Sequence, residues 1–278
     1  MLSYRHSFHA GNFADVIKHI VIIEILDYLI QKDKAFEYVD THAGAGLFDL
    51  KSGHATKLNE YVNGIAKLKA KDWPELSRYF EVIKTYNSAN TLSYYPGSPL
   101  IAMHFLRPQD RAWFFELHRH DYDLLTNNTG SNKRIKTMHE DGFTGLLPLL
   151  PFSSRRGLVL IDPSYEVKTD YKTVFKVISD AHGKFSTGTY ALWYPVVERK
   201  KIDKLEKNFI HSGIKNIQRF ELGLEADSNA KGMTASGMIV INPPWTLIKK
   251  MTRLLPKLVD TLGENDNAFF KCDILVGE

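Results

Sequence analysis

The sequence predicts an α/β fold in which a mostly parallel, seven-stranded sheet carries helices on both faces. Short apolar runs alternate with segments of helical periodicity along most of the 278 residues. The last two runs are joined by a turn-rich connection, GLEADSNAKGMTAS, which predicts that the last strand pairs antiparallel with its predecessor. No linker divides the chain, so we expect one Rossmann-like domain over residues 1–278.

The apolar runs set the expected order of elements. We expect strands at residues 36–40, 112–117, 134–139, 157–162, 189–195, 216–222 and 237–242. The segments YKTVFKVISDAH and ERKKIDKLEKNFIHSG have helical spacing and lie between successive strands. IVIIEILDYLI is expected to form a buried helix, because Glu24 and Asp27 interrupt it and it is too short to cross a bilayer.

The interval between the first two strands is longer than one crossover helix requires. It contains LNEYVNGIAKLKA and WPELSRYFEVIKTYN, both of helical period. We therefore expect an inserted helical subdomain over residues 50–95.

Composition limits the class of protein. The single cysteine, Cys272, excludes an internal disulfide and suits a reducing cytoplasm, and one thiol cannot build a cysteine zinc site. We expect no metal, although eleven histidines leave a site without thiolates open. The polar N-terminus does not resemble a signal peptide, and nothing demands more than a cytoplasmic monomer away from membranes. The net charge of +4 weakly favours a polyanionic partner.

A glycine turn follows the first expected strand. The strand ends at Asp40 and continues into THAGAG, so backbone N–H groups at Gly44 can approach a ligand closely. The dinucleotide fingerprint needs a third glycine, but Asp49 occupies that position, which disfavours a nicotinamide cofactor. S-adenosylmethionine (SAM) requires only a strand-end acid and a turn of small residues. A tight turn without a ligand is the alternative.

Two further acids follow successive strands. Glu116 could accept hydrogen bonds from both hydroxyls of a ribose, and Asp141 could accept one from an adenine amino group. With Asp40 they form an ordered series at the carboxyl ends of neighbouring strands, where open α/β sheets bind ligands. The series favours SAM as cofactor.

The fourth strand ends in Asp162-Pro163-Ser164-Tyr165. An adenine amino group is a weak nucleophile because its lone pair is delocalised into the ring. A carboxylate and a backbone carbonyl that both accept from its N–H groups localise that lone pair for attack on a methyl sulfonium. Asp162 and the Pro163 carbonyl are the candidate acceptors, and a splayed-out base could stack on Tyr165. A solvent-exposed turn is the alternative.

A similar tetrapeptide, Asn242-Pro243-Pro244-Trp245, follows the last strand. If that strand is antiparallel, its carboxyl end lies at the opposite edge of the sheet from Asp162. We therefore expect DPSY to be catalytic and NPPW to be structural.

These motifs resemble a known family along essentially the whole chain. The carrying segments are MLSYRHSFHAGNFADVIKH, VDTHAGAG, YYPGSPLIA, FELH, DGF, RRGLVLIDPSYE, YALWYPV and GMTASGMIVINPPW. They are similar to those of the RlmJ family, ribosomal RNA large-subunit (adenine-N6) methyltransferases of bacteria, which are class I SAM-dependent enzymes. The resemblance implies N6 methylation of one adenine in 23S rRNA, with a helical insertion in a Rossmann-like domain.

The resemblance also implies site residues. The cofactor contacts of the family correspond here to His19, His42, Ser98, Glu116, Asp141, Gly142 and Asp162. Its catalytic carboxylate corresponds to Asp162, and its RNA-contacting tyrosine to Tyr4. The usual family spelling is DPPY, so Ser164 departs from it and loosens the turn that aims the Pro163 carbonyl.

Other roles follow from residue types, each with a plainer alternative. Ser98 is expected as a helix N-cap before Pro99, or in contact with the ligand. Lys18, beside His19, could meet the carboxylate of the cofactor or be a solvated lysine next to a core histidine. Tyr4 and His6, with Arg5 between them, offer stacking and phosphate contacts, or belong to an unstructured tail. Candidate phosphate contacts, or solvated surface, are Arg155-Arg156 and Arg199-Lys200-Lys201.

Two other classes of function remain open. A DNA adenine or protein-glutamine methyltransferase would share the catalytic tetrapeptide. A non-catalytic RNA-binding relative would keep the basic and aromatic surface but bind SAM weakly or not at all.

Overall fold

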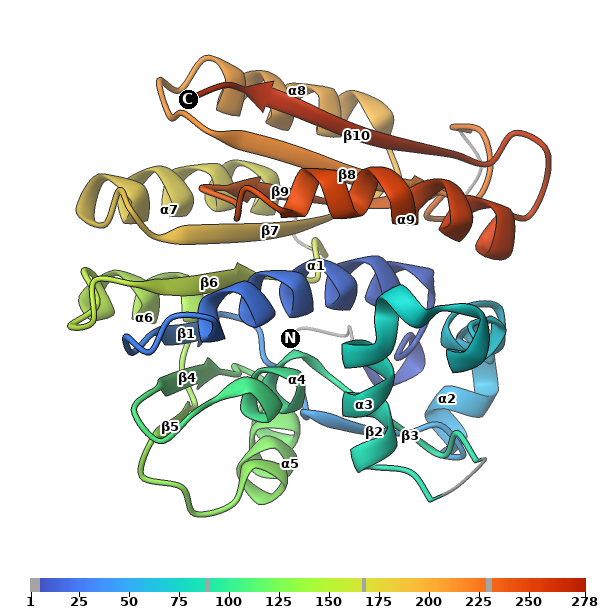
Figure 1. Cartoon of the computed structure of the whole chain (residues 1–278), viewed down its shortest axis with the longest axis horizontal. Helices are drawn as coiled ribbons and strands as arrows, with labels where there is room; N and C mark the ends of the chain where they lie inside the picture. Colours follow the sequence, from blue (N-terminus) through green and yellow to red (C-terminus); the bar gives the residue numbers. More distant parts are fainter. Residues whose placement is uncertain (1–5, 89–90, 167–168, 229–231) are drawn as a thin grey trace.

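The computed structural model describes residues 6–88, 91–166, 169–228 and 232–278, and it forms a three-layer α/β fold (Figure 1). The central sheet has the strand order β10-β8-β9-β7-β6-β1-β4-β5. Its strands are β1 (Glu37–Asp40), β4 (Arg111–Phe115), β5 (Ile135–Met138), β6 (Gly157–Ile161), β7 (Thr189–Val196), β8 (Ile217–Gly223), β9 (Ala235–Ile241) and β10 (Phe269–Val276). Six strands run in one direction, whereas β9 and β10 run against them.

The sheet confirms the predicted class and the antiparallel pairing of β8 with β9, but the expected number of strands was wrong. Within the described chain the central sheet has eight strands, because Phe269–Val276 adds an edge strand beside β8. This segment lacks a continuous apolar run, since Lys271 and Asp273 interrupt it. Lys271 forms an ion pair with Glu221 of β8, and Asp273 forms one with Arg219 of β8.

Helices cover both faces of the sheet. They are α1 (Phe13–Ile30), α4 (Ser98–Phe105), α5 (Arg119–Thr129) and α9 (Leu247–Leu262) on one face, and α6 (Gly142–Leu149), α7 (Asp170–Lys184) and α8 (Arg199–Ile210) on the other. The alternation along β6 shows how one strand serves both cores. Leu158 and Leu160 belong to the α1 side, while Val159 and Ile161 belong to the α7 side.

A mostly helical segment lies between β1 and α4. It comprises β2 (Leu47–Asp49), α2 (Gly53–Leu58), η2 (Glu60–Asn63), η3 (Ile65–Lys67), η4 (Ala70–Asp72), η5 (Pro74–Leu76), α3 (Ser77–Thr85) and β3 (Tyr94–Pro96). LNEYVNGIAKLKA forms short 3₁₀ turns here rather than a long helix. Gly64 lies between η2 and η3. The backbone of Gly64 is so close to the Gly11 carbonyl that a Cβ atom would be 2.1 Å from that oxygen.

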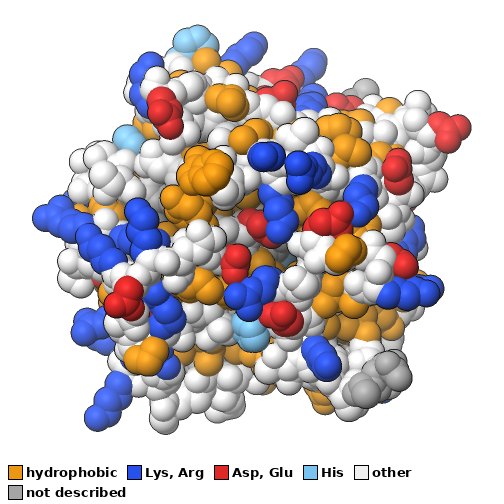
Figure 2. Space-filling model, viewed as in Figure 1, with side chains coloured by type: hydrophobic (Ala, Val, Ile, Leu, Met, Phe, Trp, Pro, Cys, Tyr) orange, Lys and Arg blue, Asp and Glu red, His pale blue; other side chains and the backbone are white. Residues whose placement is uncertain are grey.

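This segment covers the start of α1, beside the 3₁₀ turn η1 (His6–Phe8) (Figure 1). On the face shown in Figure 2, Lys and Arg side chains are scattered among acidic and apolar ones rather than gathered into one large patch. The small positive net charge alone therefore does not identify a binding surface on this face.

Candidate functional site

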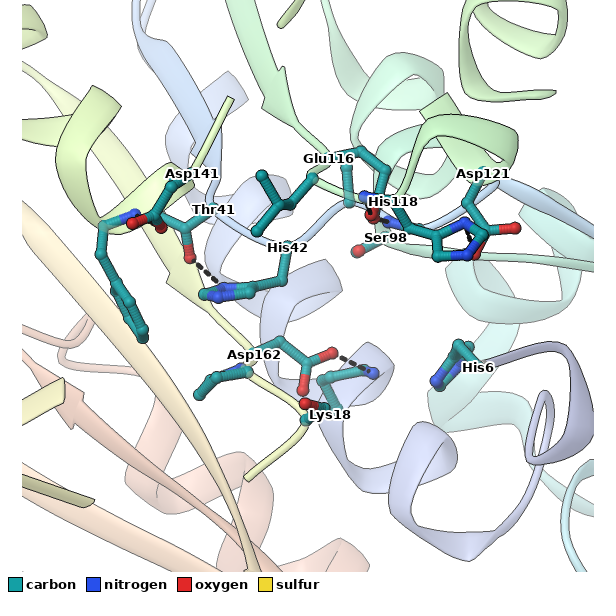
Figure 3. A pocket seen from close by; sticks show the side chains of 18 of the residues that line it. His6, Lys18, Thr41, His42, Ser98, Glu116, His118, Asp121, Asp141 and Asp162 are labelled. Carbon is teal, nitrogen blue, oxygen red and sulfur yellow. Dashed lines mark hydrogen bonds and ion pairs between the residues drawn. The ribbon is translucent and has the colours of Figure 1, made fainter. Parts of the chain in front are cut away.

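The carboxyl ends of the neighbouring strands β5, β4, β1 and β6 meet at one edge of the sheet and open into a cavity of about 320 Å³. The sequence-predicted residues that line it are His6, Lys18, His19, His42, Gly44, Ser98, Glu116, Asp141, Gly142, Asp162 and Pro163. Figure 3 shows that several of them project inward from separate elements. The fold thus brings together side chains that lie far apart in the sequence. Tyr4 lies outside the described residues.

Glu116 is fixed by the glycine turn. One of its carboxylate oxygens accepts from the Gly44 N–H at 2.8 Å, and the other accepts from the His118 N–H at 2.6 Å. The turn depends on Gly44, whose φ of 61° lies in the left-handed region. Burial raises the pKa of Glu116. Its two oxygens are held side by side, as the proposed contact with two ribose hydroxyls requires.

Asp141 is the N-cap of α6. Its carboxylate accepts from the Phe143 N–H at 3.0 Å and from the Thr144 hydroxyl at 3.1 Å. Gly142 then passes against the backbone of Thr41, where a Cβ atom would lie 2.0 Å from the Thr41 carbonyl oxygen. Only glycine permits this close approach, which places the helix N-terminus and its exposed acid at the cavity.

Asp40 lies fully buried below the turn. Burial raises the pKa of Asp40 to about 6, although a hydrogen bond with Ser98 opposes this rise. The expected capping role of Ser98 was wrong: Gly97 is the N-cap and Ser98 is the first residue of α4. The Ser98 hydroxyl forms a hydrogen bond with Asp40 instead. Gly97 is held separately, by a bond from its N–H to the Gly46 carbonyl at 2.7 Å.

Burial favours the neutral form of two of the cavity histidines, His42 and His19. Burial lowers the pKa of His42 to about 4 and that of His19 to about 3. The Nδ1 atom of His42 lies 2.8 Å from the Thr41 hydroxyl, and that of His19 lies 2.6 Å from the Tyr95 hydroxyl. Both rings can therefore offer one donor and one acceptor without carrying charge.

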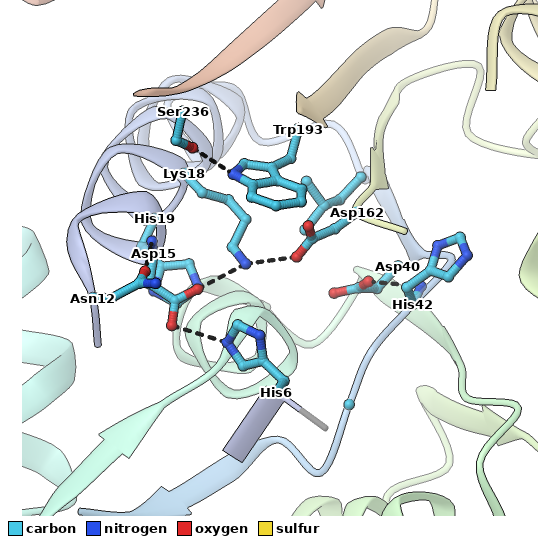
Figure 4. A network of polar contacts seen from close by, with 12 residues as sticks. His6, Asn12, Asp15, Lys18, His19, Asp40, His42, Asp162, Trp193 and Ser236 are labelled. Atoms are coloured by element: carbon cyan, nitrogen blue, oxygen red, sulfur yellow. Dashed lines mark hydrogen bonds and ion pairs between the residues drawn. The ribbon is translucent and has the colours of Figure 1, made fainter. Parts of the chain in front are cut away.

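Lys18 joins the start of α1 to the end of β6 (Figure 4). Its ammonium group contacts Asp162 Oδ2 at 2.5 Å and Asp15 Oδ1 at 2.8 Å, and its side chain is only 4% exposed. Burial alone would lower the pKa of Lys18, but the attraction of the two carboxylates outweighs it and raises that pKa. Lys18 is thus a buried lysine in an ion pair with the proposed catalytic carboxylate, rather than a solvated lysine.

A second cavity, of about 280 Å³, lies on the other side of this ion pair. It shares His6, Lys18, Asp162 and Ser164 with the first cavity. Its aromatic lining consists of Tyr165, Tyr171 and Trp193, and the side chains of Lys201 and Met233 also line it. The two cavities therefore meet at Asp162.

Tyr165 is oriented by the wall of the second cavity. Its φ is 54°, its hydroxyl donates to the Trp193 carbonyl at 2.7 Å, and its ring centroid lies 4.6 Å from that of Tyr171. The Trp193 ring is fixed in turn by a buried bond from its indole N–H to the Ser236 hydroxyl at 2.8 Å. The aromatic lining is therefore preorganised for a flat, apolar group.

The second tetrapeptide lies at the opposite edge, as expected. The antiparallel register pairs Ile241, just before NPPW, with Tyr190 at the start of β7. The Asn242 amide donates to the Ser186 and Gly188 carbonyls at 2.8 Å each, which fixes the loop before β7. Asn242 thus has a structural role, and Trp245 is 75% exposed.

The predicted basic contacts divide between the two edges. Arg155 and Arg156 precede β6 and lie at the edge remote from the cavities, where Arg156 donates to the Lys34 carbonyl. Arg199 is held in ion pairs with Glu221 and Asp227. Of the two runs, Lys201 alone lines a cavity described above.

Sequence analysis missed Asp15 and Trp193. Asp15 is 1% exposed and contacts Lys18, the Gly11 N–H at 2.8 Å and His6 at 2.9 Å. A signal was present, because Asp15 precedes Lys18 by three residues and His19 by four on one helix. Trp193 lies within a continuous apolar strand and gives no such signal.

The cavity chemistry fits SAM. Two oxygens of Glu116, the exposed acid Asp141 and neutral imidazoles provide acceptors and donors of the kind that a nucleoside needs. The buried Nδ1 atom of His118, on the cavity wall, lies 3.6 Å from Asp121 Oδ2 and makes no hydrogen bond within the described residues. The described residues contain no cluster of three His, Cys, Asp or Glu side chains placed to share a metal ion. Within the same ranges, no helix combines the length and hydropathy of a membrane span.

Comparison with known proteins gives a consistent result. Residues 33–274 match the family model described as "Ribosomal RNA large subunit methyltransferase D, RlmJ". The chain is 50% identical over 265 residues to ribosomal RNA large subunit methyltransferase J of Haemophilus influenzae, with 94% of each chain covered. It is 51% identical over 260 residues to the protein of that name from Escherichia coli, with 93% of each covered.

Solved structures agree on the fold. Protein LPL1258 of Legionella pneumophila superimposes with a TM-score of 0.87 at 39% identity, covering 96% of this chain and 98% of that one. A probable spermidine synthase of Corynebacterium glutamicum gives a TM-score of 0.50 at 12% identity, covering 96% of this chain and 77% of that one. The latter similarity concerns the fold alone.

Proposed function

Since this chain belongs to the RlmJ family of SAM-dependent ribosomal RNA large subunit methyltransferases, we propose that it methylates the N6 amino group of a specific adenine in 23S rRNA. The observation that carries the proposal is the meeting of two cavities at Asp162. One has the polar lining of a nucleoside cofactor site, and the other has the aromatic lining of a base site. We assign SAM to the first and the target adenine to the second.

The first cavity would hold SAM through side chains at successive strand ends. Glu116 would accept from the ribose hydroxyls, and Asp141 with the N-terminus of α6 at Gly142 would contact the adenine end. Gly44, Ser98, His19 and His42 would form the remaining wall. When bound, the cofactor supplies a methyl group on a positively charged sulfur.

The second cavity would hold the adenine after it has left the base stack. Tyr165 would provide the stacking face, with Tyr171 and Trp193 as further aromatic wall. Its aromatic lining lies against Lys18, whose ammonium is 5.8 Å from the centre of the Trp193 ring. The aromatic wall recognises the flat base, and Tyr4 and His6 would contact the RNA outside it.

Asp162 would activate the nucleophile. Oδ2 is occupied by Lys18, and Oδ1 makes no hydrogen bond within the described chain, so Oδ1 can accept from the amino group. The Pro163 carbonyl would accept from the second N–H. Two acceptors would localise the nitrogen lone pair, which would form the new N–C bond while the C–S bond of the sulfonium breaks and its electron pair returns to sulfur. The amino nitrogen would then release one proton to water. Positioning and charge provide the rate enhancement.

Asp162 is therefore the catalytic residue of the proposal, and Lys18 holds it in place. Both cavities are built from one chain, so we also propose that the protein acts as a monomer.

The test is methyl transfer from labelled SAM to unmodified, protein-free 23S rRNA, with duplex DNA as competitor and nucleoside analysis of the product. We expect N6-methyladenine in the RNA with the wild type and at least a hundredfold less with Asp162→Ala. Asn242→Ala is the matched control, since it alters the corresponding residue of NPPW at the opposite edge. Full activity of Asp162→Ala would refute the catalytic assignment.

The alternatives give different results in the same assay. Label in DNA alone would identify a DNA adenine methyltransferase. RNA binding with little or no SAM binding, and without methyl transfer, would favour the non-catalytic relative. Label in an added protein substrate would favour glutamine methylation.

A further inference from the structure

The helical segment between β1 and α4 packs tightly against the residues that precede α1. The Ile65 N–H donates to the Gly11 carbonyl at 2.9 Å, and Gly64 packs so closely there that no side chain would fit. Gly11 and Asn12 come directly before α1, which carries Lys18. The segment therefore contacts the part of the chain that leads to the proposed catalytic centre.

Glu60, the first residue of η2, makes this contact polar. Its Oε2 atom accepts from the Asn12 amide at 2.9 Å, and both of its carboxylate oxygens lie 3.0 Å from His9 Nδ1. Asn12 is only 6% exposed, although it also lines the second cavity, and its amide uses Glu60 as acceptor. One carboxylate thus fixes two residues of the segment that precedes α1.

From Asn12 the contacts continue to the carboxylate of the active site. The Asn12 side-chain oxygen caps α1 by accepting from the Asp15 N–H at 3.0 Å. Asp15 contacts Lys18 at 2.8 Å, and Lys18 contacts Asp162 at 2.5 Å. Figure 4 shows Asn12, Asp15, Lys18 and Asp162 following one another in this order.

We propose that Glu60 is a positioning residue for methyl transfer, acting through Asn12, Asp15 and Lys18 on Asp162. The inference rests on the proposed function of Asp162. It gives the inserted segment a role in catalysis, because a carboxylate outside both cavities sets the angle at which α1 presents Lys18. Loss of Glu60 leaves the buried Asn12 amide without its acceptor and allows the cap of α1 to shift. Small displacements of this kind strongly reduce the rate of a reaction that depends on alignment.

The experiment compares Glu60→Ala, Glu60→Gln and the control Glu75→Ala. Glu75 belongs to the same inserted segment and also forms an ion pair, with Lys257 of α9 at 2.8 Å, but that pair does not lead to Asp162. We measure kcat and KM for 23S rRNA and SAM, together with hydrogen exchange of the backbone amides over residues 11–18.

We expect Glu60→Ala to lower kcat about tenfold and to speed exchange at the Gly11 and Asp15 amides. Glu60→Gln keeps a carbonyl oxygen for the Asn12 amide, so its kcat should recover to within about threefold of the wild type. Glu75→Ala should change neither kcat nor exchange over residues 11–18.

The proposal is overturned if Glu60→Ala keeps the wild-type kcat, or if Glu75→Ala lowers kcat equally. If Glu60→Ala does not fold, Glu60→Asp decides, because its shorter side chain withdraws the carboxylate from the Asn12 amide. A reduced kcat with faster exchange supports the proposed connection from Glu60 to Asp162, and wild-type values for both refute it. If the wild type transfers no methyl group to RNA, the proposed function fails, whereas the exchange measurement still tests the connection from Glu60 to α1.

Discussion

Replacement of Asp15 by asparagine removes one charge from the buried network without changing its shape. Asp15 is 1% exposed and contacts Lys18, His6 and the Gly11 N–H. The variant Asp15→Asn leaves the buried Lys18 ammonium with Asp162 as its single carboxylate partner. We expect this change to lower both the free energy of unfolding and the rate of methyl transfer.

The size of the effect follows from burial. Removing one partner of a buried ion pair costs about 3–5 kcal/mol, because the other charge stays buried. Lys18 retains Asp162 at 2.5 Å, so we expect the lower end, about 3 kcal/mol, which corresponds to roughly a hundredfold change in the unfolding equilibrium. The control Asp27→Asn lies on the same helix, but its pair with Arg78 is 34% and 48% exposed and should contribute less than about 1 kcal/mol.

Urea unfolding of both variants at neutral pH measures these differences, provided that the m-values agree. Burial would raise the pKa of Asp15, but the attraction of His6 and Lys18 outweighs it and lowers that pKa well below the ordinary value. A lowered pKa contributes stability above the unfolded-state pKa of about 4, which is lost as the pH falls further. The difference between wild type and Asp15→Asn should therefore close in acid. Equal stability of the two proteins at pH 7, or an equal loss in Asp27→Asn, would refute the reasoning.

Three further predictions concern the tetrapeptides and His42. Asn242→Ala should lower the free energy of unfolding by about 2 kcal/mol, because the Asn242 amide donates to two carbonyls and the φ of this residue is 50°. Trp245→Ala should change the free energy of unfolding by less than about 0.5 kcal/mol, because Trp245 is exposed. Thermal unfolding compares the two variants, and a larger cost at Trp245 would contradict the structural role of Asn242. Ser164→Pro should preserve or raise the turnover of methyl transfer, since proline stiffens the turn before Tyr165, and a loss of more than about tenfold would show a role for the serine hydroxyl. Burial lowers the pKa of His42 to about 4, so His42→Gln should leave the pH dependence of SAM affinity unchanged between about pH 6 and 8. Calorimetry measures this affinity, and an inflection in that range that is present in the wild type and absent from His42→Gln would refute a neutral ring.

The cofactor cavity could be predicted from sequence because its signals are local. Asp40 ends a strand that the apolar pattern reveals, and Glu116, Asp141 and Asp162 each follow one. Parallel strands bring their carboxyl ends to one edge. Strand direction was also decisive for the two tetrapeptides. NPPW keeps the two consecutive prolines that DPSY lacks, yet the reversal of β9 places it at the far edge.

The remaining features depend on contacts between distant residues. Lys18 and Asp162 are 144 positions apart, so neither the ion pair nor the participation of Asp15 follows from periodicity. The second cavity combines side chains of α1, β7 and α8 that have no common motif. The edge strand β10 was missed because its charged side chains, which interrupt the apolar pattern, pair with side chains of β8. The cap at Gly97 was missed because a serine before a proline is usually the N-cap, with the proline as the first helical residue.

The wall shared by the two cavities has a consequence for binding measurements. Lys18 and Asp162 face both spaces, so a ligand that rearranges this pair in one cavity also changes the surface available in the other. Thermodynamic reciprocity then requires SAM to change the affinity for RNA by the same factor by which RNA changes the affinity for SAM. Dissociation constants should therefore be measured with each ligand alone and in the ternary complex, because any difference between them measures the coupling between the two cavities.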